Sequence, residues 1–254
     1  MIDGSNEDQQ NKATSLDYVS RRYGMELSLD KTKTLVSGVQ EKVSVNIRGT
    51  DLEQVKEFTY LGSVQNEECN SVKEVKVRIA KSTSALSRLK RVWRDSSLSI
   101  ETKLRLLRAL VLSVFLYGAE SWTLNAEIEK RINAFEMNCY RRLLQVHWTS
   151  HTTNADVWKR VTQLAGPVER FLDVVKIKKL TWFGYAIRAK GTLANTILQG
   201  IVEGTRSRGR PRRQWLNDIE KWTGLTLTQL VRLTEDRVGW RNFVDRCVAS
   251  TAPG

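Results

Sequence analysis

Two apolar stripes with helical spacing constrain the fold of this chain more than any other feature of its sequence. Their members recur every three or four residues: Ile100, Leu104, Leu107, Val111 and Val114 in the first stripe, and Ile128, Ile132, Phe135, Cys139 and Leu143 in the second. Residues at this spacing lie on one face of an α-helix, so each stripe predicts a helix that packs against neighbours. Most of the chain after residue 67 has this period, which predicts a helical bundle.

The residues before position 67 have a different pattern. Residues 25–38, 43–49 and 57–65 mix β-branched and aromatic residues between glycines, as short strands do. A helix is predicted over residues 11–23, ended by Gly24. The predicted fold class is therefore mainly α, with a small N-terminal β-hairpin region, a helical bundle and a helical C-terminal tail.

In the last third of the chain, Pro167 is expected to open a helix that runs to about Lys190, because proline is favoured at a helix start. Two further helices are predicted near 212–223 and 226–248. Four tryptophans fall in this third, and they are Trp182, Trp215, Trp222 and Trp240. The predicted domains are residues 1–66, 67–165 and 166–254, the last containing a basic loop at 203–213.

The charge of the chain favours a polyanionic partner. There are 41 Lys and Arg residues against 28 Asp and Glu, which gives a formal net charge of +13 and a pI near 9.8. Nucleic acid is favoured over a membrane, because the longest apolar run, residues 109–119, is too short to cross a bilayer and the N-terminus has no signal pattern. The expected location is the nucleus or cytoplasm, and three scattered cysteines fit reduced thiols.

Residues 73–94 carry eight basic side chains against the single acid Glu74, and these are Lys73, Lys76, Arg78, Lys81, Arg88, Lys90, Arg91 and Arg94. An ordinary solvated helix face would have the same composition. A second basic helix over 103–110 and the basic loop accompany this segment, so we favour a shared surface that follows nucleic-acid phosphates.

The loop "EGTRSRGRPRR" at 203–213 contains five arginines, which are Arg206, Arg208, Arg210, Arg212 and Arg213. Guanidinium groups suit phosphate oxygens, Pro211 stiffens the backbone, and the Gly-Arg-Pro core resembles an AT-hook that enters a minor groove. A nuclear localisation signal or a solvated linker would use the same residues. Nucleic-acid contact is the favoured interpretation, and the other two stay open.

No motif of a catalytic site is recognisable. Cys139, His147 and His151 have a spacing that could suit zinc, but a fourth ligand is missing nearby, and the place of Cys139 in an apolar stripe favours a buried thiol. No Gly-x-Ser-x-Gly motif or P-loop occurs in the sequence. We therefore assign no catalytic, metal-binding or cofactor-binding residue.

Four stretches carry a resemblance to a known family: residues 58–63 ("FTYLGS"), 102–124, 134–144 and 209–241. They resemble, in the same order, the C-terminal part of LINE-type non-LTR retrotransposon endonuclease/reverse transcriptases. The resemblance covers nearly the whole chain from about Leu16. It implies the end of a palm, a helical thumb and a basic tail that contacts nucleic acid, taken from a parent with RNA-directed DNA polymerase activity.

The chain departs from the family at the catalytic centre. Reverse transcriptases hold two metal ions with aspartates that include an adjacent pair, and this sequence contains no Asp-Asp pair. In the family the pair lies just upstream of the helix that resembles "SLDYVSRRYG" at 15–24, so the chain is expected to begin after it and to lack the polymerase site. An upstream half in the full-length parent is a candidate partner.

The resemblance implies roles for two remaining parts of the palm. Lys31, in "LDKTKT", matches a lysine that approaches the phosphates of the incoming nucleotide. Phe58, Tyr60, Leu61 and Gly62 match a hairpin that grips the primer end. An ordinary hairpin with Phe58 and Tyr60 on opposite faces is the alternative.

The predicted function is binding of RNA and/or DNA by a reverse-transcriptase C-terminal part that catalyses nothing alone. A domesticated module that binds a protein through its tryptophan-rich C-terminal helices is the alternative from another class. A fragment of a longer enzyme is a third. The sequence assigns no oligomeric state.

Overall fold

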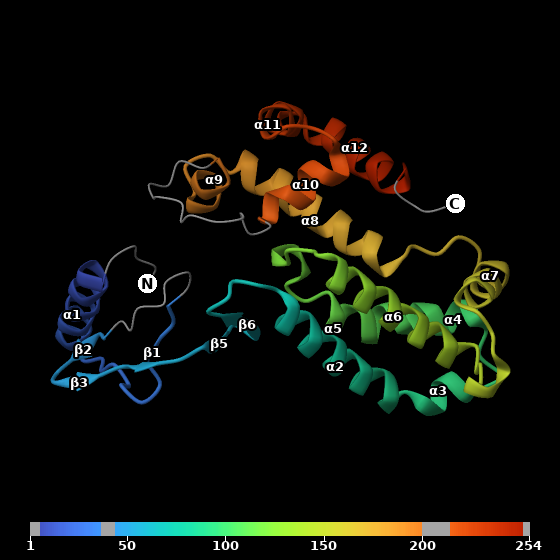
Figure 1. Cartoon of the computed structure of the whole chain (residues 1–254), viewed down its shortest axis with the longest axis horizontal. Coiled ribbons are helices and arrows are strands. Elements are labelled where there is room, and N and C mark those ends of the chain that lie inside the picture. Colours follow the sequence, from blue (N-terminus) through green and yellow to red (C-terminus); the bar gives the residue numbers. More distant parts are fainter. Residues whose placement is uncertain (1–5, 37–43, 200–213, 251–254) are drawn as a thin grey trace. The chain divides into compact units, whose positions relative to one another are not determined.

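The computed structural model describes residues 6–36, 44–199 and 214–250. The chain divides into two compact units, the first within Met1–Asn70 and the second within Ser71–Glu203 and Ser207–Gly254 (Figure 1). Helices make up most of the described residues and strands are few and short, so the predicted mainly α class is confirmed.

The first unit combines one helix with short strand pairs. Helix α1 (Asn6–Arg22) begins before the predicted residue 11 and is followed by Gly24 at a φ of 70°. Strand β1 (Lys33–Thr34) pairs in parallel with β4 (Glu53–Gln54), and β2 (Asn46–Ile47) pairs antiparallel with β3 (Thr50–Asp51). The core of this unit is small and consists of Ala13, Val45, Ile47 and Leu52.

An ion-pair cluster holds the β2–β3 turn against α1. The Arg48 guanidinium pairs with the carboxylates of Asp17 and Glu26, and its Nε lies 2.9 Å from Asp17 Oδ2. This hydrogen bond to Arg48 lowers the pKa of Asp17. The pairing therefore joins three separate segments of a unit that has little apolar core.

Strands β5 (Glu57–Tyr60) and β6 (Ser63–Asn66) form the hairpin expected at "FTYLGS". Its two-residue turn has positive φ at both Leu61 (47°) and Gly62 (82°), which is the turn type that matches the twist of a hairpin. Phe58 and Tyr60 are two residues apart on one strand and share a face, so the alternative that placed them on opposite faces was wrong in this detail. Both side chains are exposed.

The second unit begins with a group of helices around one apolar core. These are α2 (Val72–Arg88), α3 (Lys90–Arg94), α4 (Ile100–Leu106), the π-helical turn η1 (Leu107–Leu112), α5 (Ser113–Phe115), the 3-10 turn η2 (Ala119–Ser121), α6 (Ala126–Leu143), the 3-10 turn η3 (Trp148–Ser150) and α7 (Asn154–Ala165). All five members of the second predicted stripe are buried on α6, as expected.

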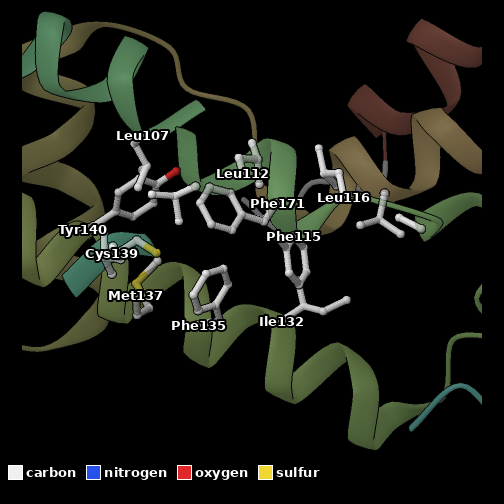
Figure 2. Packing of buried hydrophobic residues seen from close by; sticks show 14 of the residues in the cluster. Leu107, Leu112, Phe115, Leu116, Ile132, Phe135, Met137, Cys139, Tyr140 and Phe171 are labelled. Atoms are coloured by element: carbon white, nitrogen blue, oxygen red, sulfur yellow. The ribbon is translucent and has the colours of Figure 1, made fainter. Parts of the chain in front are cut away.

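Aromatic rings fill the centre of this core (Figure 2). The ring centroids of Phe115 and Phe135 are 5.2 Å apart, and those of Phe135 and Phe171 are 5.9 Å apart. Phe171 comes from the start of the next helix, α8 (Phe171–Arg188). The core therefore ties α8 to α5 and α6.

The first predicted stripe is correct as far as Val111 and fails after it. Val114 is only half-buried, whereas Phe115 is fully buried. The cause is η1, because a π-helical turn closes i to i+5 bonds and inserts an extra residue into the helix. The buried face therefore moves from Val114 to Phe115.

The C-terminal helices start and end at residues that differ from the prediction. Pro167 does not open a helix, because α7 ends at Ala165 with Gly166 as its C-cap (φ 73°), and Arg170, just before α8, is still extended. Buried Glu136 accepts hydrogen bonds from Phe171 N (3.0 Å) and Arg170 Nε (2.9 Å), and so determines where α8 begins. The later helices are α9 (Leu193–Leu198), α10 (Trp215–Thr223), α11 (Leu227–Glu235) and α12 (Arg237–Ser250), so the single helix predicted at 226–248 is two helices.

A buried ion pair joins these helices to the first core. Lys179 Nζ lies 2.5 Å from Asp218 Oδ2, and both side chains have zero exposed fraction. Lys179 Nζ also donates to the Trp122 carbonyl (2.8 Å), and Asp218 accepts from Leu124 N (2.7 Å). Because breaking such a pair leaves an uncompensated buried charge, the contact fixes α8, α10 and the segment after η2 together.

Candidate nucleic-acid interface

The solvent face of α2 is basic along its whole length. Lys73, Lys76, Lys81 and Arg88 are exposed, and the exposed residues between them include Ala80, Ser84 and Ser87. The opposite face is buried through Val75, Ser82 and Leu86. Helical spacing thus separates the cations from the core, and short side chains stand among them.

Helix α3 extends this surface with three more exposed cations, Lys90, Arg91 and Arg94. The indole Nε1 of buried Trp93 donates to the Leu86 carbonyl (2.7 Å), which fixes α3 against the end of α2. We call the seven exposed cations of the two helices the α2–α3 basic face: Lys73, Lys76, Lys81, Arg88, Lys90, Arg91 and Arg94.

Arg78 does not belong to this face. It is 5% exposed, its Nε lies 2.6 Å from Glu74 Oε1, and its guanidinium carbon lies 4.4 Å from the ring centre of Tyr117. The assignment of Arg78 as a phosphate contact is therefore corrected, since its charge is already paired inside the protein. The pairing also buries Glu74, the one acid of α2 and α3, at 3% exposure.

The second predicted basic helix contributes less than its sequence suggested. Lys103 is buried, whereas Arg105 and Arg108 are exposed on α4 and η1. Counting charges along the sequence overestimates this surface, because one of the basic positions falls on the buried side of the helix.

Arg142 joins the α2–α3 basic face from a distant part of the sequence. Its Nη1 donates to Ser87 Oγ across 2.9 Å, from the last turn of α6. Arg142 is exposed, so this contact adds a cation beside the end of α2. Sequence reasoning missed it, although the "YRRLL" stretch was part of a recognised motif.

The other predicted residues lie elsewhere. Lys31 is exposed in the turn before β1, and the hairpin residues Phe58, Tyr60, Leu61 and Gly62 are exposed on the first unit. The arginines of the loop lie outside the described residues: Arg206, Arg208, Arg210, Arg212 and Arg213. Among the predicted residues that the structure describes, only those of α2 and α3 are brought together.

The spacing of Cys139, His147 and His151 does not produce a metal site. Cys139 is fully buried in the core (Figure 2), and burial raises the pKa of its thiol, which disfavours the thiolate that binds metals. His147 and His151 are exposed. Across the described ranges, no three His, Cys, Asp or Glu side chains gather as metal ligands would.

Three of the four C-terminal tryptophans are buried or partly buried. The second unit has a second apolar core, formed by residues of α8 to α12 that include Leu180, Phe183, Ile219 and Leu230. Trp215, Trp222 and Trp240 pack in or against this second core, and Trp240 Nε1 donates to the Leu180 carbonyl (3.2 Å). Trp182 differs, because 36% of it is exposed. A protein-binding surface on these helices could therefore use one exposed indole, that of Trp182, and not four.

Comparison with known proteins finds a transposon relationship. The chain is 25% identical over 235 residues to an uncharacterized transposon-derived protein of Caenorhabditis elegans, across 88% of this chain and 84% of that protein. No protein-family model matches the sequence. No solved structure matches at a significant level. The likeness to the transposon-derived protein fits a transposon-related origin for most of the chain.

Within the described residues, none of the helices is long and apolar enough to cross a membrane.

Proposed function

We propose that this chain is the C-terminal part of a LINE-type non-LTR retrotransposon reverse transcriptase and that it binds nucleic acid through the α2–α3 basic face. The transposon-derived relative and the four ordered motifs support the origin. The chemistry of α2 and α3 supports the binding.

The observation that carries the proposal is the separation of charge on α2 and α3. Seven cations are exposed on two consecutive helices while the one acid of those helices is buried with Arg78. A face of this kind attracts a phosphate backbone without reading its sequence, because phosphate contacts release counterions and carry no base information. The exposed hydroxyl of Ser84 suits a hydrogen bond to a phosphate oxygen.

The proposal includes no polymerase activity for the chain by itself. Phosphoryl transfer by two metal ions needs carboxylates that bind both ions, and the sequence has no Asp-Asp pair. Lys31 would then have a role only in a parent protein that supplies those aspartates.

A charge-neutralising variant tests the binding face. Replacing Lys76, Lys81, Arg88 and Arg91 with glutamine removes four exposed cations and leaves the buried side of α2 intact. We expect weaker binding to unrelated duplexes by similar factors. The slope of log affinity against log salt should become less steep by up to about 3.6, since each phosphate contact contributes about 0.9. Fluorescence anisotropy over a salt series measures both quantities.

The matched control removes the same number of cations from other helices. It changes Lys159 and Arg160 on α7, Lys221 on α10 and Arg241 on α12, all exposed, to glutamine. This control should retain most of the affinity and the salt slope of the parent. Equal losses in both variants would show that only net charge matters and would contradict a dedicated face.

A further inference from the structure

Helix α8 has one open side that carries aromatic rings. Lys178, Thr181, Trp182 and Tyr185 are exposed at positions i, i+3, i+4 and i+7, the spacing of a single helix face. Trp182 is 36% exposed and Tyr185 is 67% exposed. We call these two side chains the aromatic ledge. The other sides of α8 are packed in the two cores, so the ledge lies on a rigid element.

The structure fixes the Trp182 indole before any ligand binds. Its ring meets Trp215 edge to face, with centroids 5.3 Å apart and an angle of 79° between planes. Trp215 is itself held by a hydrogen bond from its Nε1 to the Glu120 carbonyl (2.8 Å). A ring held in this way loses little conformational entropy when a ligand stacks on it.

Hydrogen bonds connect α8, and the segment after η2, to residues next to α2 within the second unit. Lys178 Nζ donates to the Leu116 carbonyl (3.4 Å), and the next residue, Tyr117, is exposed beneath the Arg78 guanidinium of α2. Thr123 N donates to Ser71 Oγ (2.9 Å), just before the start of α2. The ledge and the α2–α3 basic face therefore belong to one unit, in which Tyr117 is a third exposed ring, next to α2.

We propose that the aromatic ledge stacks the unpaired bases of a single-stranded nucleic acid whose phosphates are held by the α2–α3 basic face. This inference rests on the proposed function for its phosphate contacts. Aromatic side chains beside cations are the combination that binds single strands, because every base offers a π-face to a planar ring. In a duplex the bases are already stacked and paired, so the ledge favours single strands over duplexes.

The test uses three ligands of about 20 nucleotides, chosen because the expected sites span up to about 16 nucleotides. They are an oligothymidine, an abasic strand with the same phosphates, and a duplex. Tyr185→Ala and Trp182→Ala should each weaken binding of the oligothymidine by about ten-fold, the usual order of effect for one stacked base. Their affinity for the abasic strand and the duplex should match that of the parent.

Conservative and off-site variants serve as controls. Tyr185→Phe and Trp182→Phe keep a planar ring and should retain most of the oligothymidine affinity. Val238→Ala removes an equally exposed apolar side chain from α12 and should change nothing. Thermal unfolding of each variant checks that the helices remain folded, and Tyr185 is the cleaner site because Trp182 also packs on Trp215.

The outcomes separate the two proposals. If the parent binds none of the three ligands, the proposed function is wrong. If the parent binds all three and the alanine variants bind oligothymidine as the parent does, the ledge is wrong and the phosphate face stands; the open aromatics would then suit a protein partner. Equal losses on all three ligands would give the two side chains a structural role and would also overturn the ledge.

Discussion

At the scale of single residues, three buried acids shape the second unit. Glu74, Glu136 and Asp218 are each paired with a cation from Arg78, Arg170 and Lys179 respectively. Every such pair is neutral, so the net charge of +13 falls on the remaining groups. Because Glu74 is buried in one of these pairs, the solvent side of α2 and α3 carries basic side chains and no acidic ones.

Glu136 makes the stability of the fold depend on pH in a specific direction. Burial raises its pKa, and the opposing effects of Arg170, the Phe171 amide and Tyr140 do not cancel this. The folded protein therefore holds the Glu136 proton more tightly than the unfolded chain does. As pH rises from the usual glutamate value of 4.5 towards the raised value, the free energy of unfolding decreases.

We expect acidification from neutral pH towards 4.5 to raise the free energy of unfolding of the parent relative to that of Glu136→Gln. The variant has no carboxyl at this position and serves as the reference for all other titrating groups. Urea denaturation at a series of pH values measures the difference. A difference that stays constant over this range, or that changes in the opposite direction, would contradict the pKa shift.

At the scale of elements, α8 contributes to both apolar cores of the second unit. Phe171 and Val175 belong to the first core, and Leu180 and Phe183 belong to the second. Figure 1 shows α8 between α6 and the C-terminal helices, in agreement with its contacts to both groups. A helix packed on two sides can present only a narrow open strip, and Trp182 and Tyr185 occupy that strip.

Gly184 lets α12 approach α8 closely. A Cβ atom at this position would stand 2.2 Å from Trp240 Nε1, which is shorter than any allowed contact. Overpacking usually costs about 1–3 kcal/mol, and a contact this short belongs at the upper end of that range. The higher helix propensity of alanine offsets about 1 kcal/mol of this cost. Gly184→Ala should therefore lower the free energy of unfolding by a net amount of about 1–2 kcal/mol.

Chemical denaturation followed by tryptophan fluorescence measures this effect. Thr181→Ala is the control, because it alters an exposed position of the same helix. If Gly184→Ala proved as stable as the parent, the close packing of Trp240 on α8 would be wrong.

At the scale of the whole molecule, the proposed role of the chain is to bind nucleic acid without polymerase activity of its own. Purified chain with an annealed primer and template, all four deoxynucleotides and Mg²⁺ or Mn²⁺ should show no primer extension, because the sequence lacks the Asp-Asp pair. A denaturing gel compares the products with those of a mock preparation. Metal-dependent extension above the mock level would show that other carboxylates bind the ions.

The sequence by itself determined the features that depend on neighbours along the chain. The mainly α class, the buried stripe of α6 and the hairpin turn at Leu61 and Gly62 follow from helical spacing and turn chemistry within short windows. The exposed cations of α2 were predicted for the same reason, since their spacing opposes that of Val75 and Leu86.

The tertiary structure alone decided which groups meet across long separations. Arg78 had the composition of a surface residue, yet the core around α2 buried it with Glu74. Glu136, 35 residues before Phe171, set the start of α8, and η1 moved the buried face from Val114 to Phe115. Periodicity reports which side of one helix is apolar, whereas pairing of buried charges and shifts in helix phase depend on the free energy of contacts between elements.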